Sequence, residues 1–297
     1  MGQSGLVTLR DYIRWAMSRF NQEKLFFMQN GEGAFDEARA LVLGALHLPE
    51  ALHDKYLDCN LHSDEHAKVH RVLEQRIQQR VPAAYLLEEV WFAGLQFKVN
   101  QQVMIPRSPI EELLEQQFAP WLAQEPRRIL DLCAGSGCLG IACATAFPDA
   151  EVWLSELCES ALVIAQENIT LHQLGGRVQA QRSDLLTQFV GQRFDLIVCK
   201  PPYLSEQQFT QLPQELQYEP WHSVVAGQSG LEVIQQILQH AGAYLENDGL
   251  LVLEVGPHCE AVSALYPDFD FIWFEHSQAE STAVLALTAQ QLNQSKH

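Results

Sequence analysis

The sequence predicts an α/β protein whose larger part is a doubly wound, mostly parallel sheet, preceded by a small helical N-terminal domain. Three observations support this prediction. Apolar residues recur at helical spacing up to about residue 80, strand-like and helix-like segments alternate from residue 128, and two strand-like segments close the chain with no helix between them. Alternating strands and helices are typical of a parallel sheet, whereas a strand pair with a short connection includes one antiparallel strand.

Residues 1–87 are predicted to form the helical domain. Three segments place apolar residues on one face of a helix. These residues are Leu9, Tyr12, Ile13, Ala16 and Phe20; Phe35, Ala38, Leu41, Val42 and Leu46; and Val69, Leu73 and Ile77. The glycine-containing run at 30–33 separates the first two helices. Three or four helices of this size form a small bundle.

Residues 88–109 are predicted to form a linker that contains a β-hairpin. The run from Trp91 to Val99 is rich in aromatic and β-branched residues and has a glycine near its middle, which is typical of a short hairpin. The segment Pro106-Arg107-Ser108-Pro109 ends the linker. A helix from Ile110 to about Leu122 is then expected to begin the second domain, residues 110–297.

The second domain is predicted to contain seven strands. The predicted strands are 128–133, 151–157, 178–185, 194–199, 250–255, 269–275 and 281–288, and the predicted helices between them are 141–146, 160–172 and 231–245. The first five strands alternate with helices or loops and are expected to be parallel. The last two form the closing pair.

The formal net charge of −18 argues against a protein that binds nucleic acid. Proteins that hold DNA or RNA present a basic surface to the phosphates, and this chain has 37 acidic residues against 19 basic ones. An acidic surface either aids solubility or attracts a basic protein partner. The composition alone does not separate these two roles.

The cysteine pattern is typical of an intracellular protein. Seven cysteines occur without a C-x-x-C pair, which indicates reduced thiols used as small apolar residues. The chain opens without a secretory leader and has no run of 18 apolar residues. We therefore expect a cytoplasmic protein without a membrane-spanning segment.

The sharpest local motif is the run from Asp131 to Gly140, where the first strand meets the first helix. Ligands of doubly wound sheets bind at this edge, and glycines allow a ligand to approach the backbone closely. The run matches the dinucleotide pattern G-x-G-x-x-G, and Glu156 stands about 20 residues further on, where a ribose-binding acid is expected. A nicotinamide or flavin enzyme is therefore one interpretation.

Two observations favour S-adenosylmethionine as the cofactor instead. The carboxylate of Asp131, at the strand end, would repel a pyrophosphate but attract the ammonium of a methionine moiety. The closing strand pair also differs from the second half of a dinucleotide-binding fold. In this interpretation Glu156 accepts hydrogen bonds from the ribose hydroxyls, and Asp184, at the end of the third strand, binds the adenine amino group.

Each of these acids could instead cap the following helix. Three acids at the ends of successive strands favour a shared ligand site over three separate caps. The predicted cofactor-binding residues are Asp131, Cys133, Ala134, Gly135, Ser136, Gly137, Glu156, Asp184 and Leu185.

A second motif, Lys200-Pro201-Pro202-Tyr203, follows the fourth strand. Two prolines after a buried strand make a rigid, extended loop at the edge where ligands bind. The run resembles the Asn-Pro-Pro-Tyr loop of amino methyltransferases, with lysine in place of asparagine.

The surrounding sequence resembles one branch of these enzymes, the ribosomal protein glutamine methyltransferases, which are related to the release-factor glutamine methyltransferases. The resemblance spans nearly the whole chain. It is carried by residues 10–16, 18–20, 82–86, 91–94, 105–110, 131–137, 219–220, 226–227 and 254–256. The segment Arg107-Ser108-Pro109-Ile110 favours the ribosomal branch over the release-factor branch.

The resemblance implies a Rossmann-like, seven-stranded class I methyltransferase sheet and a helical substrate-binding domain. It also implies N5-methylation of a glutamine in a basic protein, the third protein of the large ribosomal subunit. In the family, the loop asparagine and the carbonyl of the first proline accept the two N–H bonds of the glutamine amide, and the tyrosine packs near the substrate. By position these are Lys200, Pro201 and Tyr203, and Pro202 completes the predicted catalytic motif.

Lysine at position 200 conflicts with this scheme. An ammonium has three donors and no acceptor. At about 5 Å from a sulfonium, with an effective dielectric constant of about 20, its charge would cost roughly 3 kcal/mol. The side chain would have to turn to solvent or lose its proton to avoid this repulsion.

The sequence therefore leaves several functions open. The chain is either a methyltransferase impaired at Lys200 or a relative that binds cofactor and partner without catalysis. A release factor is an alternative substrate. A DNA adenine methyltransferase, which uses a similar loop, is disfavoured by the acidic charge and the lack of a basic recognition domain.

Other polar residues are assigned no function. His62, His66 and His70 share a helical face but do not form an H-E-x-x-H site, so no metal site is expected. His222 lies in a loop after the second motif. Arg107 either contacts substrate or holds the linker.

Overall fold

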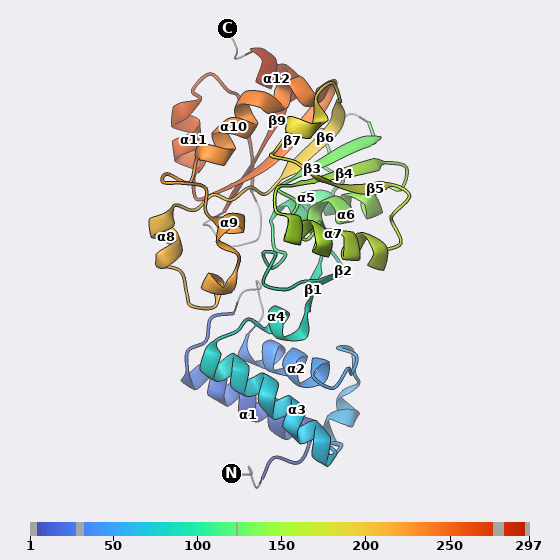
Figure 1. The fold of residues 1–297 in the computed structure, drawn as a ribbon, viewed down its shortest axis with the longest axis vertical. Helices are drawn as coiled ribbons and strands as arrows, with labels where there is room; N and C mark the ends of the chain where they lie inside the picture. The colour runs from blue at the N-terminus through green and yellow to red at the C-terminus, as the bar shows by residue number, and fades with distance from the viewer. Residues whose placement is uncertain (1–4, 28–32, 123, 276–281, 295–297) are drawn as a thin grey trace. The chain divides into compact units, whose positions relative to one another are not determined.

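The computed structural model describes residues 5–27, 33–122, 124–275 and 282–294 (Figure 1). The chain divides into two compact units: a helical unit of residues 1–89 and 212–218, and a sheet unit of residues 90–211 and 219–297. The predicted hairpin linker therefore belongs to the sheet unit, and the first boundary lies two residues beyond the expected one. Residues 212–218, expected in the second domain, fold instead with the first.

The helical unit contains the three predicted helices. Its elements are α1 (Leu9–Gln22), α2 (Ala34–Gly44), the 3-10 turn η1 (Asp54–Asp58), α3 (Ser63–Glu74), the π-helical turn η2 (Gln75–Gln79), α4 (Ala83–Leu87) and, from the returning segment, the 3-10 turn η4 (Leu216–Tyr218). A capping box at Thr8 begins α1. The predicted apolar residues of α1 and α3 are buried in one core.

Two residues of the predicted apolar face of α2 differ from the prediction, although Leu46 still packs against the core as a partly buried side chain. Phe35 is 50% exposed, and Leu46 lies beyond the last residue of the helix, Gly44. Of the predicted break at 30–33, residues 30–32 lie outside the described residues, and Gly33 is the N-cap of α2. The helix therefore begins close to where the glycine pattern predicts it.

The sheet unit is built on seven strands in the order β5-β4-β3-β6-β7-β9-β8. The strands are β3 (Arg128–Leu132), β4 (Glu151–Glu156), β5 (Val178–Arg182), β6 (Phe194–Cys199), β7 (Leu245–Gly256), β8 (Ile272–Phe274) and β9 (Ala283–Thr288). β3 to β7 pair in parallel, whereas β9 pairs antiparallel with both β7 and β8. Within the described seven-stranded sheet β9 alone runs antiparallel to the other strands, which confirms the predicted fold class.

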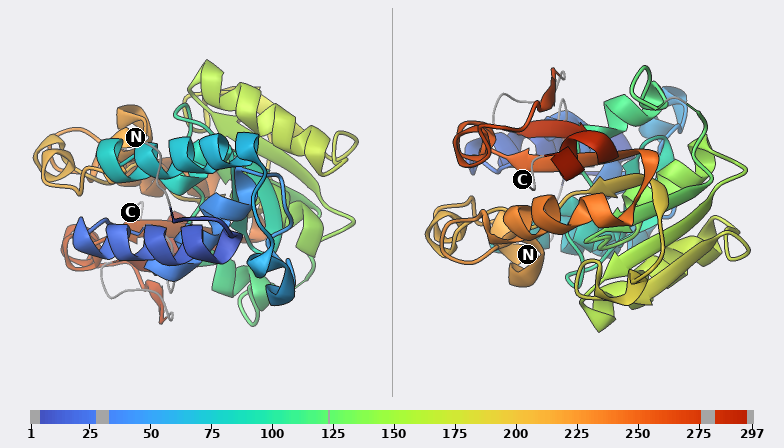
Figure 2. Two further views of the ribbon diagram at one scale, coloured as in Figure 1. Left: turned by 90° about the horizontal axis from the view of Figure 1, so that it is seen from below. Right: turned by 90° about the horizontal axis from the view of Figure 1, so that it is seen from above.

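Helices flank the sheet and can be followed in Figure 2. They are α5 (Ile110–Glu115), α6 (Cys138–Ala146), α7 (Glu159–Leu171), α8 (Glu206–Thr210), α9 (Trp221–Val224), α10 (Glu232–His240), α11 (Cys259–Leu265) and α12 (Ala289–Gln294), with 3-10 turns η3 (Thr187–Phe189) and η5 (Ala241–Tyr244). None of the described helices is long and apolar enough to cross a membrane.

The predicted hairpin forms from β1 (Glu89–Phe92) and β2 (Leu95–Lys98). Its two turn residues, Ala93 and Gly94, have φ of 49° and 70°. Positive φ at both central positions is the geometry of a type I′ turn, which matches the twist of the flanking strands.

Several boundaries differ from the sequence prediction. The helix expected to reach Leu122 ends at Glu115, the strand expected to reach residue 185 ends at Arg182, and the helix expected to reach residue 245 ends at His240. β7 begins at Leu245 rather than residue 250, although it includes the turn-like run at 247–249. Leu245 and Leu250, on either side of this run, pair with Phe194 and Leu196 of β6, and the register shift between them places the run in an irregular part of the strand.

Alternate residues of β3 face opposite sides of the sheet. Leu130 and Leu132 belong to the core that contains Ile234 and Ile237 of α10. Asp131 lies on the opposite face, next to Gly140 of α6. The period of two along the strand therefore directs the Asp131 carboxylate toward the start of α6.

Candidate active site

The turn between β3 and α6 brings backbone to the carboxyl edge of the sheet. Cys133, Gly135 and Gly137 have φ of 58°, 55° and 80°, so the chain reverses sharply from strand to helix. A Cβ on Gly137 would lie 2.8 Å from Leu154 Cδ1 of the neighbouring strand. Glycine is therefore required at position 137 both by its conformation and by its packing.

Asp131 is a buried carboxylate with one unpartnered oxygen. It is 1% exposed, and its Oδ2 accepts the N–H of Gly140 at 2.8 Å. Among the described residues, its Oδ1 has no hydrogen-bond partner. Burial, with a smaller contribution from the charge of Glu156, raises the pKa of Asp131 to about 8, against the effect of the Gly140 bond. A donor on a cationic ligand would satisfy this oxygen.

Glu156 and Asp184 end the next two strands along the same edge. The two oxygens of Glu156 accept the N–H groups of Gly135 and Cys158, each at 2.8 Å, which fixes the carboxylate while leaving each oxygen a further lone pair. Asp184 follows β5 and is exposed. Because β3, β4 and β5 are parallel neighbours, the acids after them meet at one edge of the sheet.

These three acids line one cavity of about 360 Å³, within the usual range for a small-molecule site. The cavity is also lined by most of the other sequence-predicted site residues, namely Cys133, Ala134, Gly135, Ser136, Leu185, Lys200 and Pro202. Three predicted residues, Gly137, Pro201 and Tyr203, are not among its lining residues. The cavity therefore joins the glycine-rich turn and the Lys-Pro-Pro-Tyr loop in one site.

Lys200 neither turns to solvent nor loses its proton, the two alternatives considered from the sequence. Its ammonium pairs with the carboxylate of Glu254 and donates to the Tyr203 hydroxyl at 3.3 Å. Burial lowers the pKa of Lys200, but the charge of Glu254, the Tyr203 hydroxyl and the hydrogen bond to Glu254 together outweigh it, and the pKa is raised overall. Lys200 is therefore a cation that faces a compensating carboxylate, so the repulsion expected for an isolated ammonium is reduced.

Glu254, on β7, is fully buried and accepts hydrogen bonds from two segments, the motif loop and the segment around Ser108. Besides Lys200, it accepts hydrogen bonds from Ser108 Oγ at 2.6 Å and from the Tyr203 hydroxyl at 3.1 Å. The loop is held further by His258, whose Nε2 lies 2.7 Å from the Tyr203 carbonyl oxygen. The motif loop is thus fixed against β7 and the segment around Ser108.

Arg107 has a structural role that the sequence left open. Its guanidinium donates two hydrogen bonds to the buried Glu219, at 2.5 and 2.6 Å, and Glu219 also accepts the N–H of Ile105 at 3.0 Å. Arg107 therefore holds the segment after the hairpin against the chain at Glu219. Arg107 also lines the cavity, and a contact with substrate stays a prediction.

Other cavity residues were given no role from the sequence. Ser108, His222 and Ser223 line the cavity; His222 and Ser223 belong to the short helix α9, which no apolar period marked. Of the N-terminal histidines, His66 Nδ1 bonds the Tyr12 hydroxyl at 3.0 Å. Within the described ranges, no cluster of His, Cys, Asp and Glu is suited to a metal ion.

Comparisons with known proteins place these features in a family. Residues 112–218 match the family model of the methyltransferase small domain. The chain is 38% identical to the ribosomal protein uL3 glutamine methyltransferase of Francisella tularensis, over 97% of this chain and 92% of the relative. It is 39% identical to the protein of the same name from Bordetella pertussis, over 97% of each chain.

A solved structure shares the fold at low sequence identity. The catalytic domain of hMettl16, in complex with a MAT2A 3'UTR hairpin, superposes with a TM-score of 0.54 at 12% identity, covering 94% of this chain and 91% of that one. This likeness concerns the fold alone.

Proposed function

The chain belongs to the family of ribosomal protein uL3 glutamine methyltransferases, and from this premise we propose that it methylates the side-chain amide of a glutamine in ribosomal protein uL3. The observation that carries the proposal is the full-length relationship, 38% and 39% identity over 97% of the chain. The net charge of −18 supports a basic protein substrate rather than a nucleic acid. The enzyme would then act in the cytoplasm.

S-adenosylmethionine is the proposed cofactor, and when bound it supplies an electrophilic methyl group on a sulfonium. The unpartnered Oδ1 of Asp131 supports this proposal, because it offers a buried acceptor for the ammonium of the methionine moiety. Glu156, fixed by two backbone N–H groups, would accept the ribose hydroxyls. Asp184 would bind the adenine amino group, and Cys133, Ala134, Gly135, Ser136, Gly137 and Leu185 would enclose the cofactor.

The substrate amide must be held by acceptors, because the lone pair of its nitrogen is delocalised and the nitrogen is a weak nucleophile. Correct orientation of such a group supplies several kcal/mol, up to roughly 7–11 in ideal cases. The Pro201 carbonyl would accept one amide N–H. Lys200 cannot accept the other, since all its polar hydrogens are donors, but its ammonium can donate to the amide oxygen.

A second function is favoured by the same residue. The Lys200–Glu254 pair fills the position of the family's acceptor with a donor, which suits a protein that binds cofactor and substrate without transferring the methyl group. The two functions predict different rates of methyl transfer when Lys200 is replaced by asparagine.

The test is methyl transfer to purified uL3 by the wild-type protein and by Lys200→Asn, with methylated glutamine measured by mass spectrometry. We expect Lys200→Asn to be faster by about 10²-fold, the size typical for one lost hydrogen bond to the reacting group. Lys98→Asn serves as the control, because Lys98 is 52% exposed and pairs with Glu167; it should match the wild type. A release factor as substrate tests the alternative branch.

Each other outcome has a defined meaning. If neither the wild type nor Lys200→Asn transfers a methyl group to uL3, the non-catalytic function is favoured. Equal and substantial rates would contradict the role given to position 200. Methylation of a release factor but not of uL3 would overturn the substrate assignment.

A further inference from the structure

The loop that carries Lys200 and Tyr203 continues into the helical unit. After α8 the chain leaves the sheet unit at Gln211, contributes Leu212–Tyr218 to the helical unit, and returns at Glu219; we call Leu212–Tyr218 the tether. The residues before it include Lys200 and Pro202, and those after it include His222 and Ser223. All four line the cavity.

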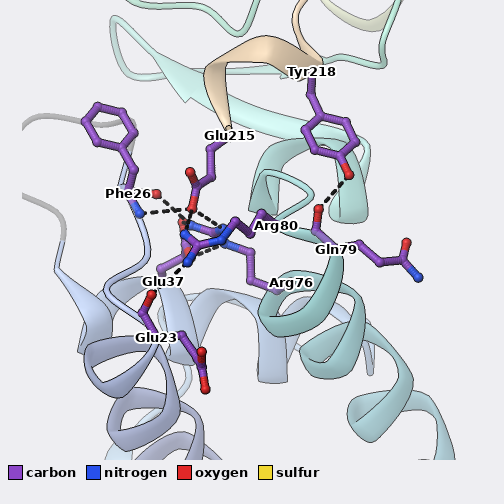
Figure 3. Close-up of polar contacts among 8 residues, drawn as sticks. All are labelled: Glu23, Phe26, Glu37, Arg76, Gln79, Arg80, Glu215 and Tyr218. Atoms are coloured by element: carbon purple, nitrogen blue, oxygen red, sulfur yellow. Dashed lines mark hydrogen bonds and ion pairs between the residues drawn. The ribbon is translucent and has the colours of Figure 1, made fainter. Parts of the chain in front are cut away.

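The tether is held through one fully buried carboxylate, Glu215 (Figure 3). Glu215 is 1% exposed, and its Oε1 accepts hydrogen bonds from the Phe26 N–H at 3.0 Å, from Arg80 at 3.0 Å and from Arg76 at 3.4 Å. Burial raises the pKa of Glu215, but the hydrogen bonds it accepts and the charge of Arg76 together lower the pKa by more, so it lies below its ordinary value. The tether is therefore fixed at a specific point rather than resting on the surface.

In the helical unit, the two arginines that bind this carboxylate are also held by other hydrogen bonds. Arg76 is fully buried and also donates to Glu37 at 2.7 Å and to the Phe26 carbonyl at 2.7 Å. Arg80, in the left-handed region at φ 59°, donates to the Glu23 carbonyl at 2.8 Å. Each arginine is thus oriented by contacts of its own as well as by Glu215.

A second contact secures the end of the tether. The Tyr218 hydroxyl donates to the Gln79 carbonyl at 2.6 Å (Figure 3). Gln79 ends the π-helical turn that follows α3, and carbonyls at a helix end lack partners within the helix. Tyr218 therefore satisfies a group that the helix leaves open.

A buried ionic cluster is not needed merely to add stability. Taking charges out of water costs free energy that their attraction only partly repays, and apolar residues often serve a core equally well. What such a cluster does provide is a defined position, because its hydrogen bonds are directional and all must be made together.

We infer that Glu215 is a positioning residue of the cofactor cavity. By fixing the tether in the helical unit, it restricts the two segments that flank the tether, residues 204–211 and 219–226, and so keeps the motif loop and α9 in place. Through the tether, the helical unit, which is expected to bind substrate, is then coupled to the motif loop, which is expected to orient the substrate. The effect on methylation rests on the proposed function, whereas the effect on loop motion does not.

Hydrogen–deuterium exchange on the full-length protein without ligand tests the coupling. In Glu215→Ala we expect faster exchange in residues 204–211 and 219–226 as well as in the tether, with β3, β4 and β6 unchanged. Asp58→Asn is the matched control: it removes a carboxylate of the same unit that is 67% exposed and pairs with Arg10, and it should leave all of these segments unchanged. Changes confined to the tether and the helical unit would overturn the inference.

A milder pair of variants covers the case in which Glu215→Ala does not fold. Glu215→Gln keeps an acceptor oxygen, and Tyr218→Phe removes one exposed hydrogen bond. Both should raise exchange in the flanking segments in the same direction as Glu215→Ala and by less. No change in those segments in either variant would contradict the inference.

Methyl transfer supplies a separate readout. If the wild type or Lys200→Asn is active on uL3, adding Glu215→Gln should lower kcat by about 10- to 100-fold, the effect of misplacing a reacting group by about 1 Å, with the Kd of S-adenosylmethionine unchanged. An unchanged kcat would overturn the inference. A complete lack of methylation in the parent proteins would refute the proposed function alone and leave the exchange result to decide the coupling.

Discussion

Asp131 and Glu254 are both buried carboxylates of the central strands, and their partners distinguish their roles. Glu254 is surrounded by protein donors: Lys200, Tyr203 and Ser108. One oxygen of Asp131 accepts a hydrogen bond from a backbone N–H. The other oxygen accepts no hydrogen bond from any of the described residues. Glu254 therefore acts within the protein to hold the motif loop, whereas Asp131 is available to a ligand.

The raised pKa of Asp131 leads to a prediction about pH. Since the pKa is raised to about 8, the ligand-free protein holds this carboxyl mostly protonated at pH 7, and a cationic ammonium favours the ionised form. Binding of S-adenosylmethionine should therefore release a proton, and the affinity should increase as the pH rises from 6 to 8. Equilibrium titrations across this range measure the effect.

Two variants check the assignment to Asp131. Asp131→Asn should weaken binding and abolish its dependence on pH, whereas Asp184→Asn, which alters an exposed acid of the same cavity, should weaken binding and keep the dependence. Binding by the wild type that does not vary between pH 6 and 8 would show that Asp131 does not meet a cation.

At this scale the sequence indicated which acids to consider but not what Lys200 would do. Asp131, Glu156 and Asp184 could be identified because each lies near the end of a predicted strand. The partner of Lys200 lies 54 positions away and that of Arg107 lies 112 positions away. No local pattern marks such pairs, since only the tertiary fold brings them together.

The strand–turn–helix element of β3 and α6 explains why the sequence allowed two cofactors. A Cβ on Gly140 would lie 2.2 Å from Leu154 Cδ2 and 3.1 Å from the Asp131 side chain. The third glycine of the G-x-G-x-x-G pattern is thus required by the close packing of helix on sheet, whatever ligand binds. The motif identifies the element, and the surrounding acids are needed to discriminate between cofactors.

This packing predicts the effect of one methyl group. Gly140→Ala should lower the free energy of unfolding by about 1–3 kcal/mol, because an extra methyl in a close-packed interior forces its neighbours to shift. Gly175→Ala is the control, since a Cβ there meets nothing within 4 Å, and it should change the free energy by less than about 0.5 kcal/mol. Urea unfolding measures both, and equal stabilities would contradict the packing argument.

Element boundaries were predicted less well than element types, for a tertiary reason. The run at 247–249 has turn residues, yet it lies within β7 because Leu245 before it and Leu250 after it both pair with β6, across a register shift. β5 stops at Arg182 because Leu185 takes a positive φ of 47°. Local preference is outweighed by strand pairing at one site and by a turn toward the cavity at the other.

At the scale of the whole molecule, the sequence predicted two domains but not the return of residues 212–218 to the first. The contacts of Glu215 with Arg76 and Phe26 span 139 and 189 positions, and the segment carries no apolar period of its own. The return matters for function, because it joins the helical unit to the segments that carry Lys200 and His222.

We propose that the cavity at the ends of β3, β4 and β5 holds S-adenosylmethionine rather than a dinucleotide. Isothermal titration calorimetry of the purified full-length protein with S-adenosylmethionine and with NAD tests it most directly. We expect saturable, one-to-one binding of S-adenosylmethionine and no measurable binding of NAD. Binding of NAD in preference to S-adenosylmethionine would contradict it.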